Sequence, residues 1–173
     1  MQLMLLTNPI ATSLLAAASD LAWQTRCAVT GTSALRLGED VAVRPSPGKG
    51  LGVFALRDIA DESVVARYSG RLYSRAAFDA AGAAGETSGD YALELMPGWI
   101  IDGEDPERSS WARYINHSMR RRNCFAFSGP GFVYLKAIKD IPKGEELFFQ
   151  YGDDYWEDRA PELSWRRVAI DLL

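Results

Sequence analysis

The sequence predicts a single, mainly β domain with a few short helices. The chain has 173 residues, of which 47% are hydrophobic and 24% are charged, and this is typical of one globular domain with its own core. From residue 41 onward, short runs rich in β-branched and aromatic residues alternate with glycine and proline. Such runs are typical of strands separated by turns. Pattern alone would place these strands in a sandwich or a barrel.

Two strands and one helix are expected in the first half of this region. Leu51–Leu56 and Ser63–Tyr68 are rich in aliphatic and aromatic side chains, which favours strands. A helix is expected over Ser74–Ala81, because serine is a favoured N-cap residue and Gly82 follows as a favoured helix stop.

Two hairpins and a final strand are expected in the second half. Pro97-Gly98 and the Gly-Pro-Gly segment 129–131 each separate two apolar runs, which predicts a turn between two strands. Residues Ser109–Ile115 are expected to form one or two helical turns. The strands are expected at Tyr91–Met96, Trp99–Asp102, Cys124–Ser128, Phe132–Ile138 and Glu146–Tyr151, and a C-terminal helix at Tyr155–Leu173.

Charge and cysteine content narrow the class of protein. The formal net charge is −4 and the isoelectric point is near 5.1, which argues against direct nucleic-acid binding and suits a basic peptide as partner. A structural zinc site usually takes four Cys or His ligands, and Cys27, Cys124 and His117 are too few, so we expect no metal site. Two widely spaced cysteines indicate an intracellular protein of the nucleus or cytoplasm, with both thiols buried.

Residues 1–38 allow two interpretations. We favour an amphipathic helix, at about Thr12–Trp23, that packs on the domain. The alternative is an organelle-targeting leader, because the segment is poor in acids and rich in Ser and Thr, although it is also poor in arginine. No basic stretch precedes the first apolar residues, as a secretory signal requires, and no run reaches the ~20 apolar residues of a membrane span.

Three short motifs could carry chemistry, although each also has an ordinary structural explanation. Gly48–Gly52 precedes a strand instead of opening a helix, so it is either a tight turn or a loop that approaches a ligand closely, and not a nucleotide-binding loop. Asn116-His117-Ser118 gathers several hydrogen-bonding groups at one spot, which suits a polar cofactor. Tyr151 places a phenol at the end of a strand, beside a glycine.

Taken in order along the chain, these motifs resemble the successive motifs of the SET-domain family of protein lysine methyltransferases. The resemblance extends from Val41 to about Trp156, and its most specific parts are Asn-His-Ser and Glu-Glu-Leu…Tyr. The chain departs from the family at Met119–Arg122, where many members carry Cys and Pro-Asn, and it has no flanking zinc-binding cysteines. The matching segments are Gly48–Ala55, Tyr68–Gly70, Tyr91–Leu95, Ile101-Asp102, Arg113–Ser118, Asn123-Cys124 and Gly144–Gly152.

The resemblance implies the fold and the position of the sites. A SET domain over residues 41–156 would have the β-clip fold of short curved sheets, with a knot-like threading of the C-terminal segment, and a helical tail at 157–173 would close the cofactor site. S-adenosylmethionine would bind on one face and a lysine side chain would enter a channel from the other. The implied cofactor-binding residues are Lys49, Gly50, Tyr91, Arg113, Asn116, His117, Tyr151 and Trp156. The implied channel residues are Tyr68, Phe125 and Phe149, with Tyr151 and Tyr68 as catalytic residues.

The implied activity is transfer of a methyl group to a lysine of a histone or another protein. A phenol with a reference pKa near 10 is a poor base at pH 7, so we expect the Tyr151 hydroxyl to orient the reactants. Phenylalanine at position 149 is associated in this family with di- or trimethylation. The alternative is a catalytically inactive SET module that binds a peptide as an adaptor.

Overall fold

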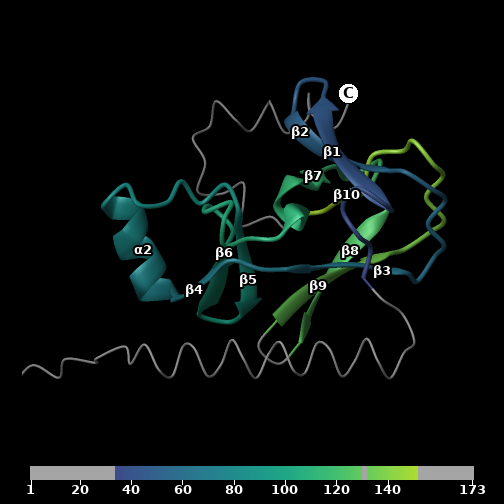
Figure 1. Ribbon diagram of the computed structural model, residues 1–173. Coiled ribbons are helices and arrows are strands. Elements are labelled where there is room, and N and C mark those ends of the chain that lie inside the picture. The colour runs from purple at the N-terminus through teal and green to yellow at the C-terminus, as the bar shows by residue number, and fades with distance from the viewer. Residues whose placement is uncertain (1–33, 130–131, 152–173) are drawn as a thin grey trace, which may run out of the picture.

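The computed structural model describes residues 34–129 and 132–151 (Figure 1). One α-helix, α2 (Arg75–Ala83), and one 3-10 helix (Trp111–Tyr114) accompany short strands in this part of the chain. The strands are β1 (Val41–Ser46), β2 (Gly50–Ala55), β3 (Val64–Tyr68), β4 (Arg71–Ser74), β5 (Ala92–Met96), β6 (Trp99–Asp102), β7 (Asn116–His117), β8 (Cys124–Gly129), β9 (Phe132–Ala137) and β10 (Phe148–Phe149).

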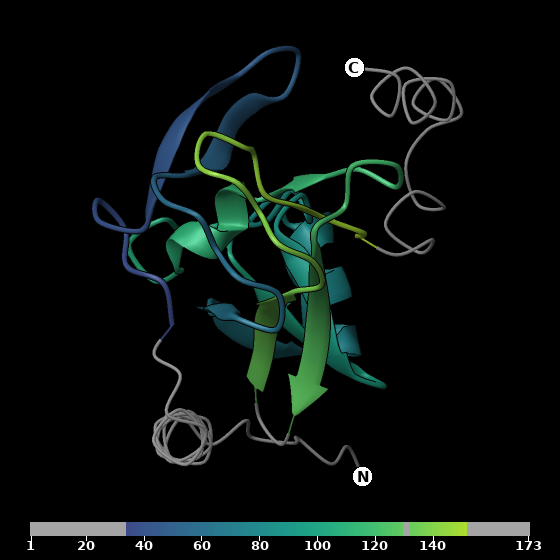
Figure 2. The same ribbon diagram turned by 90° about the vertical axis from the view of Figure 1, so that its right-hand side faces the viewer.

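The strands form four small sheets instead of one large one. Two of them are antiparallel and three-stranded, with the strand orders β3-β9-β8 and β4-β6-β5. The other two are the β1–β2 hairpin and the parallel pair of β10 and β7. Figure 2 shows the β1–β2 hairpin above the β8–β9 hairpin, with α2 at the side. The mainly β prediction is confirmed. The sandwich or barrel interpretation is wrong, because strands of two to six residues with bulges in β3 and β5 do not build wide sheets.

Most of the predicted elements are present. Both hairpins and the first two strands are confirmed within one or two residues, and the 3-10 helix lies inside the helical segment predicted at Ser109–Ile115. The helix begins as predicted, with the Ser74 hydroxyl accepting a hydrogen bond from the Ala77 amide. Gly82 does not stop it: α2 continues to Ala83, and Gly85 then takes the left-handed conformation (φ 72°) that ends helices.

The predicted last strand is divided between two partners. Glu146 forms an isolated bridge with Phe54 of β2, whereas only Phe148 and Phe149 pair with β7. Strands β1, β4 and β7 were not predicted. The expected helices at Thr12–Trp23 and Tyr155–Leu173, the tail at 157–173 and the knot-like threading concern residues outside the described ranges and stay predictions.

The core lies between the sheets and is mainly aliphatic. Val41, Val53, Leu135 and Leu147 are fully buried in it. Cys124 is also fully buried, and burial raises the pKa of its thiol to about 12, so this cysteine is the inert apolar group that we expected. No helix in the described part of the chain is long and apolar enough to cross a membrane.

A polar cluster is buried where the β1–β2 hairpin meets the rest of the domain. The carboxyl group of Glu146 accepts a hydrogen bond from the Ser46 hydroxyl (2.9 Å) and one from the Asn116 amide (2.8 Å). The same amide nitrogen donates to the carbonyl of Leu51 (2.9 Å). Gly52 packs directly on this cluster, and a Cβ atom there would lie 2.9 Å from Cδ of Glu146 and 3.0 Å from Nδ2 of Asn116. Only glycine fits at position 52.

We therefore predict that Gly52→Ala lowers the free energy of unfolding by about 1–3 kcal/mol, because the methyl group must displace buried, hydrogen-bonded atoms. Gly82→Ala is the matched control: its Cβ meets nothing within 4 Å in the last turn of α2, and alanine there should stabilise by up to about 1 kcal/mol. Urea unfolding of both variants checks this, and a Gly52→Ala protein as stable as the wild type would contradict it.

Candidate active site

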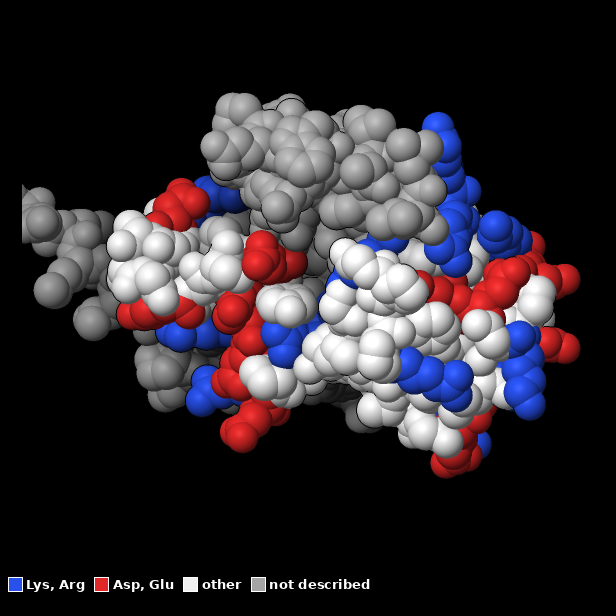
Figure 3. Space-filling model, turned by 90° about the horizontal axis from the view of Figure 1, so that it is seen from above, with Lys and Arg blue, Asp and Glu red and all other residues white. Residues whose placement is uncertain are grey.

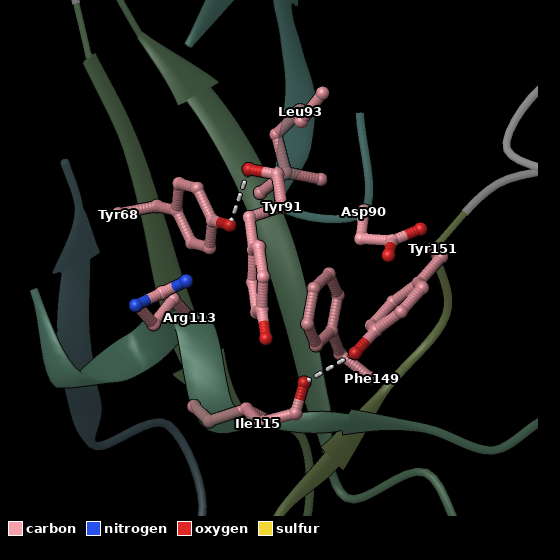
Figure 4. Close-up of a pocket in the computed structure, with 9 residues that line it drawn as sticks. Tyr68, Asp90, Tyr91, Leu93, Arg113, Ile115, Phe149 and Tyr151 are labelled. Atoms are coloured by element: carbon pink, nitrogen blue, oxygen red, sulfur yellow. Dashed lines mark hydrogen bonds between the residues drawn. The ribbon is translucent and has the colours of Figure 1, made fainter. Parts of the chain in front are cut away.

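A pocket opens where β3, β5, the 3-10 helix and β10 converge (Figure 4). It is shallow and partly open to solvent. Figure 4 shows Tyr68 and Arg113 on one side of the Tyr91 ring, and Phe149 and Tyr151 on the other. The lining residues are Tyr68, Asp90, Tyr91, Ala92, Leu93, Arg113, Ile115, Phe149 and Tyr151.

Two hydrogen bonds hold Tyr151, one at its hydroxyl and one at its backbone. Its hydroxyl donates a hydrogen bond to the carbonyl of Ile115 (2.9 Å), and its backbone N–H donates to Nδ1 of His117 (3.2 Å). The tyrosine ring also makes edge contact with the His117 ring and a tilted contact with the Phe149 ring, with centroids 5.4 and 4.8 Å apart. The phenol therefore has one defined position in the pocket, with a backbone carbonyl beside its oxygen.

His117 is buried, and its hydrogen bond defines its role in the fold. The ring is 4% exposed and lies on β7, directly opposite Phe149 of β10. Since Nδ1 accepts the N–H of Tyr151, that nitrogen carries no proton, and the ring hydrogen is on Nε2. A nitrogen that already accepts the backbone N–H of Tyr151 is not available as a base toward a ligand. His117 positions Tyr151.

Arg113 supports the opposite wall of the pocket. Its guanidinium lies 3.8 Å from the centre of the Tyr91 ring and donates to the carbonyl of Glu104 (3.0 Å). The hydroxyl of Tyr68 donates to the carbonyl of Tyr91 (2.7 Å). A cation over an aromatic face is stabilised by the ring quadrupole, so the buried guanidinium holds the ring of Tyr91 in place while Tyr68 holds its backbone.

Asn123 attaches the last strand to the domain. Its side-chain amide donates to the carbonyl of Glu146 (2.9 Å) and accepts from the N–H of Phe148 (2.8 Å), and its backbone N–H donates to the carbonyl of Phe148 (3.1 Å). Asn123 is 2% exposed. These bonds fix the segment that leads into Tyr151.

The glycine loop and Asn116 form a second candidate binding surface. Gly48 and Gly50 have positive φ angles (72° and 75°), and the space beside Gly50 is open. Both N–H groups of the Asn116 side chain are used, by Leu51 and Glu146, which leaves its amide oxygen available to accept from a ligand. An exposed backbone loop beside a fixed acceptor suits a small polar cofactor with an amino group.

The structure brings together most of the predicted site residues. One pocket is lined by Tyr68, Tyr91, Arg113, Phe149 and Tyr151. Asn116 contacts β2, the strand that begins at Gly50, through its hydrogen bond to Leu51. The side chain of Lys49 lies over the ring of Phe148, 5.8 Å from its centre.

Lys49, Gly50, Asn116 and His117 do not line this pocket, and neither does Phe125, which was predicted as a channel residue. Phe125 is 44% exposed, and its ring contacts Phe127 on the outer face of the β3-β9-β8 sheet, so it is not among the residues that line the pocket. Trp156 lies outside the described residues. Sequence reasoning had placed both by their position in the motif order alone.

Four residues that line the pocket were not predicted as site residues: Asp90, Ala92, Leu93 and Ile115. The contribution of Ile115 is a backbone carbonyl, which any residue type can provide, so no sequence signal identifies it. Asp90, Ala92 and Leu93 lie within two residues of Tyr91 and could have been proposed as its neighbours in the same segment.

The charged surface is mixed. On the face shown in Figure 3, acidic and basic side chains are interspersed over the described part of the molecule. Within residues 34–129 and 132–151, no three His, Cys, Asp or Glu side chains lie close enough together to hold a metal ion. The pocket is lined by aromatic rings, aliphatic side chains, one buried guanidinium and the carboxylate of Asp90.

Comparison with known families agrees with this geometry. Residues 50–152 match the family model of the SET domain. The chain belongs to the SET-domain family. The match begins in β2, includes the Asn116-His117 and Tyr151 segments, and covers more than half of the chain.

The similar proteins are larger than this chain. It is 36% identical over 115 residues to histone-lysine N-methyltransferase set-17 of Caenorhabditis elegans, which covers 63% of this chain and 39% of the relative. It is 32% identical over 125 residues to N-lysine methyltransferase KMT5A-A of Danio rerio, and the match covers 66% of this chain and 36% of that relative. A solved structure of a humanized mutant of the Chaetomium thermophilum Polycomb Repressive Complex 2 has a TM-score of 0.56 and 30% identity, covering 70% of this chain and 15% of that chain. This SET domain therefore spans less than half of each relative.

The role of Asn123 leads to a stability prediction. Asn123→Ala should lower the free energy of unfolding by about 2–4 kcal/mol, because it leaves the carbonyl of Glu146 and the N–H of Phe148 buried without partners. The control is Arg122→Ala, which removes an exposed hydrogen bond to Gln150 in the same strand region and should change stability by less than about 0.5 kcal/mol. Chemical denaturation compares them, and equal effects of the two substitutions would be inconsistent with the role given to Asn123.

Proposed function

We propose that this SET domain is an S-adenosylmethionine-dependent methyltransferase that acts on the side-chain amine of a lysine in a protein. The observation that carries the proposal is the fixed Tyr151 phenol, hydrogen-bonded to the carbonyl of Ile115 in an aromatic pocket beside the Asn116-His117 strand. The relatives named as lysine methyltransferases support the same reaction class.

The cofactor would lie against the glycine loop and Asn116. The open backbone at Gly50 allows close approach, the carbonyl groups of the loop can accept from an amino group, and the Asn116 amide oxygen can do the same. The predicted contacts of Lys49, Tyr91, Arg113, His117 and Trp156 with the cofactor belong to this proposal. When bound, S-adenosylmethionine supplies an electrophilic methyl group on a sulfonium.

The pocket would receive the lysine side chain. Its walls are the rings of Tyr68, Tyr91, Phe149 and Tyr151, which suit the aliphatic part of a lysine, and the exposed carboxylate of Asp90 lies at the rim, where it attracts a cation. An acidic chain with a net charge of −4 suits a basic partner such as a histone tail or another lysine-rich peptide.

The amine must be neutral to attack. With a reference pKa of about 10.4, deprotonation costs about 4–5 kcal/mol at pH 7. An aromatic pocket removes water from the ammonium group and so favours the neutral amine, and the buried guanidinium of Arg113 behind Tyr91 adds an unfavourable interaction with a second cation. Both effects lower the cost of presenting a neutral amine.

The Tyr151 hydroxyl would align the reacting groups. Its proton is engaged with the carbonyl of Ile115, which fixes the position of the hydroxyl oxygen in the pocket. Alignment of nucleophile, methyl group and leaving group is the main source of rate in an in-line displacement. Tyr68 would help to define the channel through its bond to the backbone of Tyr91.

The product would carry more than one methyl group. Phe149 adjoins Tyr151 at a ring distance of 4.8 Å and offers no hydroxyl that could hold a water molecule in the methylated-amine space. On this proposal the space beside Phe149 would accept a second or third methyl group.

The first test measures transfer of labelled methyl from S-adenosylmethionine to histones and to a cell lysate. Tyr151→Phe should lower kcat by about 10²–10³-fold while cofactor affinity is retained, and Asn116→Ala should weaken cofactor binding measured by calorimetry. Tyr73→Phe, a buried tyrosine that packs on α2, is the control and should be fully active. Cofactor binding by the wild type without transfer to any protein would favour an adaptor.

The second test concerns product state. Mass spectrometry of the wild-type product should show di- or trimethyl-lysine, and Phe149→Tyr should shift it toward monomethyl-lysine because the added hydroxyl can bind a water molecule in the pocket. The control is Tyr134→Phe, on the outer face of the β3-β9-β8 sheet, which should leave the product unchanged. Phe148→Tyr is not used, because Phe148 is fully buried. Monomethyl product from both wild type and Phe149→Tyr would contradict the proposal.

A further inference from the structure

The walls of the candidate pocket would also suit a methylated ammonium group. The rings of Tyr68, Tyr91, Phe149 and Tyr151 line it, and the exposed carboxylate of Asp90 lies at its rim. Cages of aromatic rings bind quaternary ammonium groups, because the negative face of each ring attracts the cation. The aromatic walls alone therefore do not decide whether the pocket takes a charged or an uncharged side chain.

Arg113 occupies one face of the Tyr91 ring. Its guanidinium carbon lies 3.8 Å from the centre of that ring, and the residue is 9% exposed. Figure 4 shows Arg113 on one side of Tyr91, with Phe149 and Tyr151 on the other. A ligand that enters between Tyr91 and these two rings therefore meets a ring whose opposite face already carries a cation.

Within the described residues, no carboxylate pairs with this buried cation. The guanidinium donates to the carbonyl of Glu104 (3.0 Å) and to the hydroxyl of Tyr114 (3.5 Å), and its Nε has no hydrogen-bond partner. The carboxyl group of Asp102 is buried too, but it accepts the N–H of Glu104 (3.0 Å) and forms no ion pair with Arg113. Asp90 is exposed, so solvent screens its charge. An arginine side chain keeps its charge, so the field of the guanidinium extends into the pocket.

We propose that Arg113 is a specificity-determining residue, which makes the pocket prefer an uncharged amine to an ammonium or trimethylammonium group. The inference rests on the proposed function, which takes a lysine side chain as the ligand. It adds that the pocket binds permanently charged, trimethylated lysine poorly, although its walls are aromatic.

This preference has a consequence for successive methylation. Lysine and its mono- and dimethyl forms can lose a proton and bind as neutral amines, whereas the trimethyl form has no proton to lose. A neutral amine still gains dispersion contacts with the Tyr91 ring, but the trimethyl form brings a second cation close to Arg113. On this proposal the fully methylated product leaves the pocket because of its charge.

The distance across the Tyr91 ring sets the size of the effect. A group in contact with the open face would lie about 4 Å from the ring centre and about 8 Å from the guanidinium carbon of Arg113. Two unit charges about 8 Å apart repel by the equivalent of about 30-fold in affinity, at an effective dielectric constant of about 20. Attraction of a cation to one ring face is worth about 30-fold or less, so the guanidinium offsets it.

Two peptides that differ only in charge test the proposal. One carries trimethyl-lysine at the central position of Arg-Ala-X-Ala-Arg, and the other carries the uncharged isostere in which carbon replaces the nitrogen. Calorimetry measures the dissociation constant of each peptide for the full chain. The wild type should bind the uncharged peptide at least about tenfold more tightly, and Arg113→Met should reduce this preference by about 10- to 30-fold. Arg113→Lys, which keeps the charge, should keep the preference.

Arg108→Met is the matched control, because Arg108 is exposed and pairs with Asp105 (3.3 Å) in the preceding loop. It should leave the preference unchanged. If Arg113→Met does not fold, the preference of the wild type and its retention in Arg113→Lys decide the matter.

Five results would overturn the proposal: equal or tighter binding of the trimethyl-lysine peptide by the wild type, an unchanged preference in Arg113→Met, loss of the preference in Arg113→Lys, the same reduction in Arg108→Met, or binding of neither peptide. Methyl transfer by the same proteins tests the proposed function separately. Transfer without a charge preference overturns only the role given to Arg113, whereas a charge preference without transfer overturns only the proposed function.

Discussion

One buried carboxyl group, that of Glu146, joins three segments that are far apart in the sequence. It accepts hydrogen bonds from Ser46 at the end of β1 and from Asn116 in β7, under the backbone of Gly52. A buried carboxyl group is costly unless its oxygens are satisfied, so each donor must occupy one position. The glycine loop, the Asn116-His117 strand and the last strand are thereby held in a fixed arrangement, and the candidate binding surface at the glycine loop depends on it.

The aromatic pocket extends the same arrangement. After Glu146, the side chain of Asn123 holds the backbone at Phe148, and the chain pairs with β7. It then reaches Tyr151, whose backbone N–H is bound by His117 and whose hydroxyl is bound by Ile115. The hydrogen-bond partners of the phenol and of its amide therefore both come from one short segment, residues 115–117. The phenol therefore keeps one orientation in the pocket.

The segment Met119–Arg122, where this chain departs from many SET domains, forms a turn that closes on the same region. The N–H of Arg121 donates to the hydroxyl of Ser118 (3.0 Å), and its guanidinium lies 4.6 Å from the centre of the Phe148 ring. Arg122 bonds to Gln150. The two arginines thus contact the last strand from outside, one through the Phe148 ring and the other through the Gln150 amide.

The sequence by itself determined the mainly β class, the hairpin turns, the N-cap of α2 and, through the order of its motifs, the family and most of the pocket residues. These depend on local propensity and on residue identity, which are written in the chain. It could not determine that the strands divide into four small sheets, that β7 pairs in parallel with β10, or that Phe125 faces outward. Those features depend on contacts between distant segments. The carbonyl of Ile115 is the clearest case, because a backbone group that every residue possesses acquires its role only when the tertiary fold places it beside the Tyr151 hydroxyl.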